Sequence, residues 1–141
     1  MEPIDSPTGW VAEHIRDYVS SGGERGHRWR GLDILLLTTT GRRSGDLRRT
    51  ALIYGKDGDR YVIVASYGGK PQHPLWYLNL VADPQVTIQV GPDVMSAQAQ
   101  TAPQAERERL WKMMAALFPS YDQYQASTTR EIPIVVLTPA T

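Results

Sequence analysis

The densest group of residues with binding chemistry lies in a stretch rich in glycine and arginine, TTTGRRSGDLRRT. Four of the chain's fifteen basic residues fall within eight positions of it: Arg42, Arg43, Arg48 and Arg49. Gly41 and Gly45 can adopt positive φ angles that turn amide N–H groups toward one point, and Ser44 and Thr50 add hydroxyl donors. Guanidinium groups bind phosphate and carboxylate oxygens in pairs. The stretch favours a site for a small polyanion, although a solvated hairpin with a soluble edge explains it about equally well.

A second candidate stretch is ASYGGKPQHPLWYLNL. A predicted strand ends at Ser66 and runs into Gly68 and Gly69, so the backbone there can approach a ligand closely. The helix that follows carries three further candidates: Trp76, Tyr77 and Asn79. Exposed amides on one side and apolar side chains on the other would suit an aromatic ring system. The alternative is that the apolar residues of this helix are ordinary core residues, which we favour for Leu78 and Leu80.

A third stretch, FPSYDQYQAST, places Phe118, Tyr121 and Tyr124 at helical spacing on one face. Such a stripe is more often core than active site, but each tyrosine keeps a polar tip that must be hydrogen-bonded or wet. Other chemistries have little support. His14, His27 and His73 lack metal-ligand spacing, so no metal site is predicted. There is no G-x-S-x-G elbow and no G-x-G-x-x-G after a strand.

Composition narrows the class of protein. The 141 residues suit one domain, the absence of cysteine excludes thiolate chemistry, and fifteen acidic residues balance fifteen basic ones, which argues against a nucleic-acid binder. The sequence contains neither a signal peptide nor an apolar run long enough for a membrane span, so we expect a cytoplasmic protein. The first helix could pack on its own domain, on a partner or on a membrane surface.

The pattern of apolar residues predicts a mainly β protein. A helix lies between an N-cap at Ser6, with Pro7 in its first turn, and a stop at residues 22–23, and the segment GGERGHRWRG is a loop. Two more helices are predicted, one from His73-Pro74 to Asp83 and one over residues 106–117, with a capping box at residues 101–104. Six strands are expected, over residues 34–40, 50–54, 61–66, 86–90, 94–99 and 132–137, with a hairpin turn at Asp57-Gly58. Short strands with hairpin links indicate a small antiparallel barrel.

Five motifs in order resemble the deazaflavin (coenzyme F420)-dependent nitroreductase family: LLLTTTGRRSG, VIVASYGG, HPLWYLNLVADP, FPSYDQYQ and REIPIVVL. They cover residues 35–137 and leave the first thirty residues outside. The resemblance implies an α+β, mainly β fold: a split β-barrel of about six antiparallel strands, similar to FMN-binding barrels, with flanking helices at both ends. Residues 1–30 would form an N-terminal helix and loop, and residues 31–141 the deazaflavin-binding domain.

The same resemblance implies residue roles. The coenzyme's phosphate and oligoglutamate tail would lie on the hairpin, and the deazaflavin would lie beyond it. The implied cofactor-binding residues are Arg42, Arg43, Ser44, Arg48, Arg49, Thr50, Ala51, Leu52, Ile53, Ala65, Ser66, Tyr67, Leu75, Trp76, Tyr77, Asn79 and Tyr121. Phe118, Tyr121 and Tyr124 would face the substrate. Relatives often carry lysine at positions 43 and 67 and proline at position 51, so Arg43, Tyr67 and Ala51 depart from the pattern.

The implied reaction is hydride transfer from reduced F420 to a small electron-poor acceptor: a quinone, an activated alkene or a nitroaromatic. Tyr121 would donate a proton or stabilise the product anion, and Ser66 would polarise the deazaflavin ring. Two alternatives are an FMN enzyme on the same barrel and a non-catalytic coenzyme carrier. A nucleic-acid-binding barrel is disfavoured by the neutral charge. As to assembly, we expect a monomer or a weak homodimer.

Overall fold

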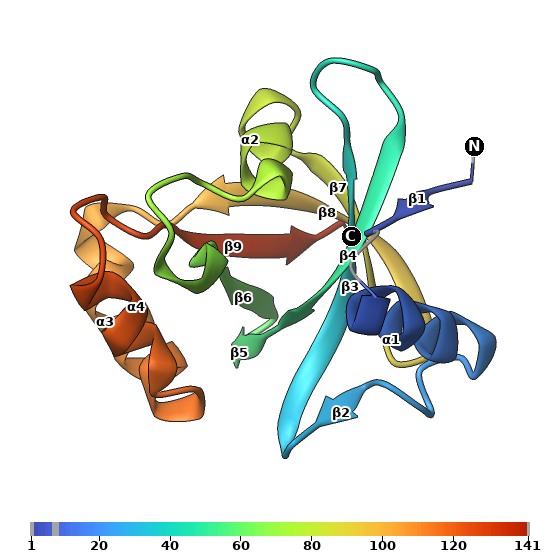
Figure 1. Cartoon of the computed structure of the whole chain (residues 1–141), viewed down its shortest axis with the longest axis horizontal. Helices are drawn as coiled ribbons and strands as arrows, with labels where there is room; N and C mark the ends of the chain where they lie inside the picture. The colour runs from blue at the N-terminus through green and yellow to red at the C-terminus, as the bar shows by residue number, and fades with distance from the viewer. Residues whose placement is uncertain (1, 7–8, 141) are drawn as a thin grey trace.

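The chain is described by a computed structural model over residues 2–6 and 9–140 (Figure 1). These residues form nine strands, four α-helices and one short 3-10 helix. The strands are β1 (Ile4–Asp5), β2 (Arg28–Trp29), β3 (Leu32–Thr40), β4 (Leu47–Ile53), β5 (Gly55–Asp57), β6 (Arg60–Val64), β7 (Gln85–Val90), β8 (Asp93–Thr101) and β9 (Ile134–Pro139). The helices are α1 (Gly9–Ser20), η1 (Tyr67–Gly69), α2 (Leu75–Ala82), α3 (Gln104–Leu117) and α4 (Ser120–Ala126).

One mixed sheet holds the strands in the order β1-β4-β3-β7-β8-β9-β6-β5, with β2 paired to β3. Every pairing is antiparallel except that of β1 with β4. β4 and β5 lie near opposite ends of this order, yet only Tyr54 separates them in the chain. The sheet must therefore curl until the end of β4 lies next to the start of β5, and β4 does contact β6.

The curled sheet leaves one edge of β4 open. Ser6 donates its amide to the Arg49 carbonyl, and β1 pairs only with residues 48–49 of β4. Backbone groups of alternate residues point to alternate edges, so those of Ala51 and Ile53 face the same edge as Arg49. Among the described residues, no ladder reaches that edge beyond residue 49. We call the gap between residues 50–53 of β4 and the facing edge of β6 the seam.

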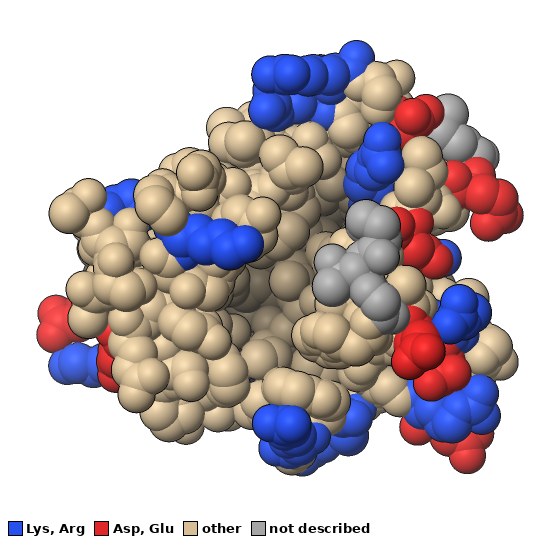
Figure 2. Space-filling view, viewed as in Figure 1, with Lys and Arg blue, Asp and Glu red and all other residues tan. Residues whose placement is uncertain are grey.

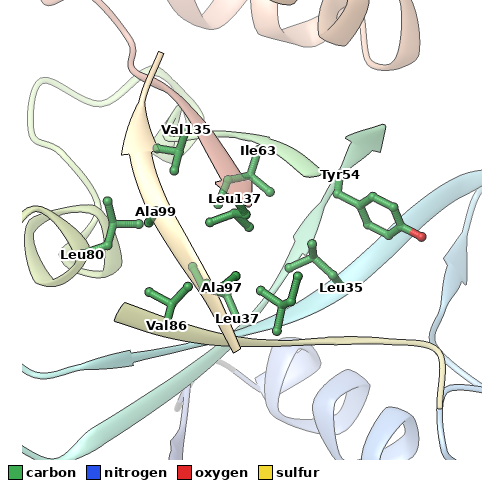
Figure 3. Close-up of a cluster of buried hydrophobic side chains, with 11 residues drawn as sticks. Leu35, Leu37, Tyr54, Ile63, Leu80, Val86, Ala97, Ala99, Val135 and Leu137 are labelled. Carbon is green, nitrogen blue, oxygen red and sulfur yellow. The ribbon is translucent and has the colours of Figure 1, made fainter. Parts of the chain in front are cut away.

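The inside of the curl is filled by apolar side chains (Figure 3). Ile63, Val135 and Leu137 meet Leu35 and Leu37 from across the sheet. Residues of one strand alternate between this inner cluster and the outer face, as the two-residue period of a strand requires. On β6, Ile63 points inward, whereas its neighbours Val62 and Val64 join a different cluster on the outer face.

Two patches of the outer face are covered by helices. α1 buries Ile15 and Tyr18 against Ile34 and Leu36 of β3, so the first helix packs on its own sheet. Its Tyr18 hydroxyl accepts a 2.7 Å hydrogen bond from the Gly91 amide and lies 3.0 Å from the Ile34 carbonyl oxygen. α3 and α4 cover β6 and β9 on the other side of the molecule (Figure 1). Between these two patches, part of the outer face is not covered by a helix of the described residues.

All six predicted strands are present, with end points shifted by a few residues. The three additional strands, β1, β2 and β5, have only two or three residues each, and such segments carry little periodic signal. β2 lies within the predicted loop 22–31. The hairpin turn is formed by Gly58 and Asp59, because Asp57 pairs with Arg60, and it joins β5 to β6 rather than β4 to β6.

The predicted capping box at residues 101–104 is wrong. Thr101 ends strand β8, and α3 begins after Pro103 without a side-chain cap, so pairing with a neighbouring strand outweighed a local capping signal. The helix start predicted at Ser6-Pro7 falls at residues 7–8, which lie outside the described residues; Ser6 itself binds the backbone and Thr50 of β4.

Candidate functional site

The arginine-rich stretch forms the tip of the β3–β4 hairpin, which we call the arginine hairpin (residues 41–49). The Gly41 amide donates to the Asp46 carbonyl at 2.7 Å, and the Gly45 amide donates to the Gly41 carbonyl at 2.9 Å. Gly45 has a φ of +77°, which disfavours any residue with a Cβ. Arg42, Arg43 and Ser44 are exposed at the tip. In Figure 2, Lys and Arg atoms gather at the top of the molecule, where Figure 1 places this hairpin.

The four arginines of this hairpin differ in their partners. Arg49 forms a paired contact with Asp5 of β1, with Nε to Oδ1 at 2.6 Å, and only 18% of its side chain is exposed. Among the described residues, the side chains of Arg42, Arg43 and Arg48 form no ion pair. These three cations therefore remain available to an anion.

Asn79 of α2 holds the arginine hairpin in place. Its Oδ1 accepts the Arg42 amide at 3.1 Å, and its Nδ2 donates to the Thr39 hydroxyl at 3.2 Å. Asn79 and Thr39 are both buried. The amide of Asn79 is thus already hydrogen-bonded at both ends, and it sets the direction in which the hairpin leaves the sheet.

The cofactor candidates on β4 divide between the two faces of the strand. Leu52 packs with the inner cluster, whereas Ala51 and Ile53 pack with α1 on the outer face. Thr50 is level with Leu37 and so faces inward, where Ser6 donates a weak 3.4 Å hydrogen bond to its hydroxyl. A ligand in the seam would meet Ala51 and Ile53 through their backbone groups as well as their side chains.

A turn with three consecutive positive φ angles lies across the seam: Tyr67 at +49°, Gly68 at +64° and Gly69 at +80°. We call residues 66–70 the glycine turn. A left-handed tyrosine is strained, since its Cβ crowds the backbone. Tyr67 is 46% exposed, and the Lys70 ammonium lies 4.4 Å from its ring centroid. Ala65 is buried, and the Ser66 hydroxyl makes no hydrogen bond within the described residues.

Arg130 holds this turn, and sequence reasoning assigned it no role. Its guanidinium donates to the Ser66 carbonyl at 2.8 Å and the Lys70 carbonyl at 2.9 Å, and it lies 3.1 Å from His73 Nδ1. Burial lowers the pKa of the Arg130 guanidinium, which still remains charged. The only signal in the sequence is its place at the start of the motif REIPIVVL, two residues before the apolar run begins at Ile132.

The other two histidines also have structural partners. His14 Nε2 lies 2.7 Å from the Gly26 carbonyl, and His27 Nε2 lies 2.9 Å from the Tyr54 hydroxyl. Across residues 2–6 and 9–140, no three His, Cys, Asp or Glu side chains come together as metal ligands.

The helix α2 contributes less to the surface than the resemblance implies. Trp76 and Tyr77 pack against the inner cluster, and the Tyr77 hydroxyl lies 2.8 Å from that of Thr101. Leu75 is 71% exposed. Both aromatic residues therefore have a structural role in addition to any contact with a ligand.

Phe118, Tyr121 and Tyr124 do form one aromatic group. The Phe118 and Tyr121 ring centroids lie 5.0 Å apart, and Tyr124 lies 6.3 Å from Phe118 and 6.4 Å from Tyr121. All three pack in the outer cluster under α3 and α4, which confirms the core interpretation of the stripe, while their contact with a substrate stays a prediction. The group adjoins the glycine turn, because Gly69 packs directly against Tyr124.

The Tyr121 side chain is largely buried, its hydroxyl included. No hydrogen bond involves this hydroxyl within the described residues, and none of their polar side-chain atoms is both fully buried and unpaired. Burial of the ring, followed by the neighbouring Tyr124, raises the pKa of Tyr121 above its ordinary value. At neutral pH the group is therefore a neutral phenol that can donate a hydrogen bond.

These parts surround a hollow. Figure 2 shows it in the middle of one face, and Figure 1, from the same side, shows α1 on one flank, η1 and α4 on the other and the arginine hairpin above. Fold and site together define a small α+β protein with a hollow on one face, and Lys and Arg side chains stand at the rim of this hollow.

Residues 10–139 match the family model described as F420H(2)-dependent quinone reductase, and the chain belongs to this family. The predicted resemblance, the dependence on reduced F420 and the assignment as an oxidoreductase are confirmed at this level. The match begins at residue 10 and so includes α1, which the sequence motifs had left outside.

Individual relatives agree with this assignment. An F420H(2)-dependent quinone reductase of Mycobacterium tuberculosis is 43% identical over 129 residues, which cover 89% of this chain and 87% of the relative. A solved F420-H2 dependent reductase (FDR-A) is 32% identical with a TM-score of 0.69, covering 97% of this chain and 98% of that one. A structure described as a domain-swapped dimer is 38% identical with a TM-score of 0.72, covering 94% and 99%. No helix of the described residues is long and apolar enough to cross a membrane.

The contact between the glycine turn and α4 can be tested with two neighbouring glycines. A Cβ on Gly69 would lie 2.3 Å from Ser127 Oγ and 2.9 Å from the Tyr124 carbonyl oxygen, whereas one on Gly68 would meet open space. Both residues have positive φ, so Gly68→Ala controls for backbone strain. We expect Gly69→Ala to lower the unfolding free energy in urea by about 1–3 kcal/mol more than Gly68→Ala does. Equal losses would show that α4 does not pack as described.

Proposed function

We propose that the protein transfers a hydride from reduced coenzyme F420 to a small electron-poor acceptor, with quinones as the principal class. One observation carries the proposal beyond family membership: three arginines without an ion pair stand beside an open strand edge. The coenzyme combines a polyanionic tail with a flat ring system. When bound, reduced F420 supplies the hydride, so the protein's residues need only bind, orient and protect the reactants.

The arginine hairpin fits the tail. Arg42, Arg43 and Arg48 would bind its phosphate and carboxylate oxygens, with Ser44 as an added donor at the tip. Charge-assisted bonds of this kind are about twice as strong as neutral ones. Arg49 is held by Asp5, and we propose that it secures β1 against the strand rather than binding the tail.

The seam fits the ring. The outward backbone groups of Ala51 and Ile53 would meet one edge of the deazaflavin. Ser66 and the glycine turn would meet it from the other side, with Ala65 and Tyr67 next to them. The exposed Leu75 and the packed Trp76 and Tyr77 of α2 would border the site. Backbone hydrogen bonds of this type orient a ring without requiring any particular side chain.

The aromatic group would hold the acceptor against the exposed face of the ring. Phe118 and Tyr124 offer apolar area, and the Tyr121 hydroxyl would donate a hydrogen bond to the oxygen that gains charge. Because the pKa of Tyr121 is raised, stabilisation of the product anion is favoured over full proton transfer. The final proton would then come from water.

The proposal also covers the fold and assembly. The curl and the seam support a split barrel like that of FMN-binding proteins, with residues 31–141 as the coenzyme-binding part and residues 1–30 as a cover for β3 and β4. Assembly as a monomer or weak homodimer is supported by the similar protein described as a domain-swapped dimer.

The activity is tested with reduced F420 and a panel of quinones, enones and nitroaromatics. We expect loss of the reduced coenzyme's absorbance to be fastest with quinones, and binding to F420 to be tighter than to FMN in the same buffer. FMN binding of equal strength would contradict the cofactor assignment. Tight binding without turnover of any acceptor would indicate a coenzyme carrier.

The tail site is tested by two arginines of the same strand region. Arg43→Gln should weaken F420 binding roughly 10- to 100-fold, the loss expected for one hydrogen bond to a charged group. Arg49→Gln should change it less than threefold, because Arg49 is already paired with Asp5. Binding by wild type should also weaken as salt screens the exposed charges. Fluorescence titration measures all three effects, and similar losses in both variants would place Arg49 in the tail site as well.

The role of Tyr121 is tested by removing only its hydroxyl. Tyr121→Phe should slow turnover roughly 10- to 100-fold, or about 1.4–2.7 kcal/mol of barrier, with little change in coenzyme affinity. Stability should not fall, because no hydrogen bond within the described residues is lost. Phe118→Ala should instead raise KM for the acceptor. Full turnover by Tyr121→Phe with every acceptor would show that Tyr121 only lines the site and takes no part in the reaction.

A further inference from the structure

Arg130 joins both ends of the glycine turn. Its two terminal nitrogens lie 3.3 and 3.4 Å from the Ala65 carbonyl oxygen, and one of them donates to the Ser66 carbonyl, both on the entering side. Its Nε donates to the Lys70 carbonyl at 2.9 Å on the leaving side. One rigid guanidinium therefore fixes the distance between the two ends of the glycine turn.

The glycine turn needs such support. Three successive residues have left-handed backbone angles, and one of them is a tyrosine. The two glycines adopt such angles freely, but the left-handed Tyr67 is strained and persists there only because surrounding contacts enforce it. Within the turn itself, the Gly69 amide bonds to the Ser66 carbonyl and the Lys70 amide to the Tyr67 carbonyl. From outside the turn, Arg130 contacts both of its ends, and Ser127 of the chain after α4 adds a weaker 3.3 Å hydrogen bond to the Gly69 carbonyl.

The contact with His73 fixes the protonation state of that ring. A guanidinium has only donors, so His73 Nδ1, 3.1 Å from Arg130, must be the acceptor. His73 is thus neutral with its proton on Nε2, and its ring packs 4.9 Å from that of Tyr77. Protonation at Nδ1 would point an N–H at the arginine and break this contact.

We propose that Arg130 is a positioning residue: with His73 as its acceptor, it fixes the glycine turn so that Ser66 and Tyr67 face the seam at the distance the coenzyme ring requires. This inference rests on the proposed function for its ligand, but the rigidity of the turn is a property of the free protein. Arg130 makes no contact with the reacting atoms and acts through the backbone it holds.

The arrangement has a defined pH dependence. Burial, and then the charge of Arg130, lower the pKa of His73 below its ordinary 6.5. The contact therefore contributes fully to stability above about pH 6.5, and it is lost as pH falls through the lowered pKa of His73. Arg130 and Tyr77 are the ionisable groups that face His73. Lys70 lies over Tyr67, and Glu131 is directed to Arg107 and Gln104.

Arg130→Lys tests the proposal, because it keeps the charge and removes the fork of donors. We expect the Gly69 and Lys70 amides to exchange hydrogen at least tenfold faster in the cofactor-free protein, and F420 to bind at least tenfold more weakly. Arg107→Lys is the matched control. Arg107 has 18% side-chain exposure and donates to the Ile132 carbonyl at 2.6 Å, but it does not contact residues 65–73. It should lower the thermal midpoint without altering either measurement.

The variant His73→Phe provides a second test, in which Arg130 itself is unchanged. It keeps an aromatic ring beside Tyr77 but removes the acceptor, so exchange of the two amides should be fast at pH 7.5 and insensitive to acid. In wild type the exchange, corrected for its intrinsic pH dependence, should accelerate below pH 6.5. Nitrogen shifts of His73 should report a proton on Nε2 at pH 7.5.

The outcomes separate the two hypotheses. If Arg130→Lys and Arg107→Lys give the same exchange rates and the same coenzyme affinity, Arg130 is only a structural residue and the proposal fails. If wild type does not bind F420, the proposed function fails, and the exchange rates still decide whether Arg130 and His73 fix the turn. A proton on Nδ1 of His73 would overturn the acceptor assignment.

Discussion

The short link through Tyr54 constrains the whole molecule. β4 and β5 belong to opposite ends of the strand order, and one residue spans only about 3.3–3.6 Å, so the sheet has to curl until these ends meet. The inner cluster fills the curl, and Tyr54 itself is buried in it. Among the described residues, the ladder does not continue from β4 to β6, and residues 50–53 of β4 have no strand partner on that edge. An open edge is usually a liability, but under the proposed function it would offer fixed donors and acceptors to a ligand.

The helices define the hollow by what they leave uncovered. α1 covers β3 and part of β4, and α3 with α4 covers β6 and β9, while the seam lies between the two patches. Each cover is locked by a polar contact at a buried point. Tyr18 binds the backbone at Ile34 and Gly91, and Arg107 binds that at Ile132. The width of the hollow therefore follows from packing that is remote from any ligand.

The tertiary structure also determines which charged side chains are paired. In this chain of zero net charge, three arginines of one hairpin form no ion pair among the described residues, whereas Arg60 and Arg109 share Asp57. Arg49 shows the alternative, since Asp5 from a two-residue strand neutralises it. Neighbouring side chains of a strand point to opposite faces, so Asp5 can neutralise Arg49 but not Arg48.

The sequence by itself determined the strand and helix content, the arginine hairpin, the aromatic group and the family, because periodicity and contiguous motifs are local properties. Only the tertiary structure decided which of the candidate site residues already have a partner within the protein. Nothing local distinguishes Arg49 from Arg48, or predicts that Asn79 tethers the hairpin, since their partners lie 44 and 37 residues away in the chain. Arg130 could not be found from spacing for the same reason: its acceptors are carbonyls 60 to 65 residues distant, and every residue type offers a carbonyl.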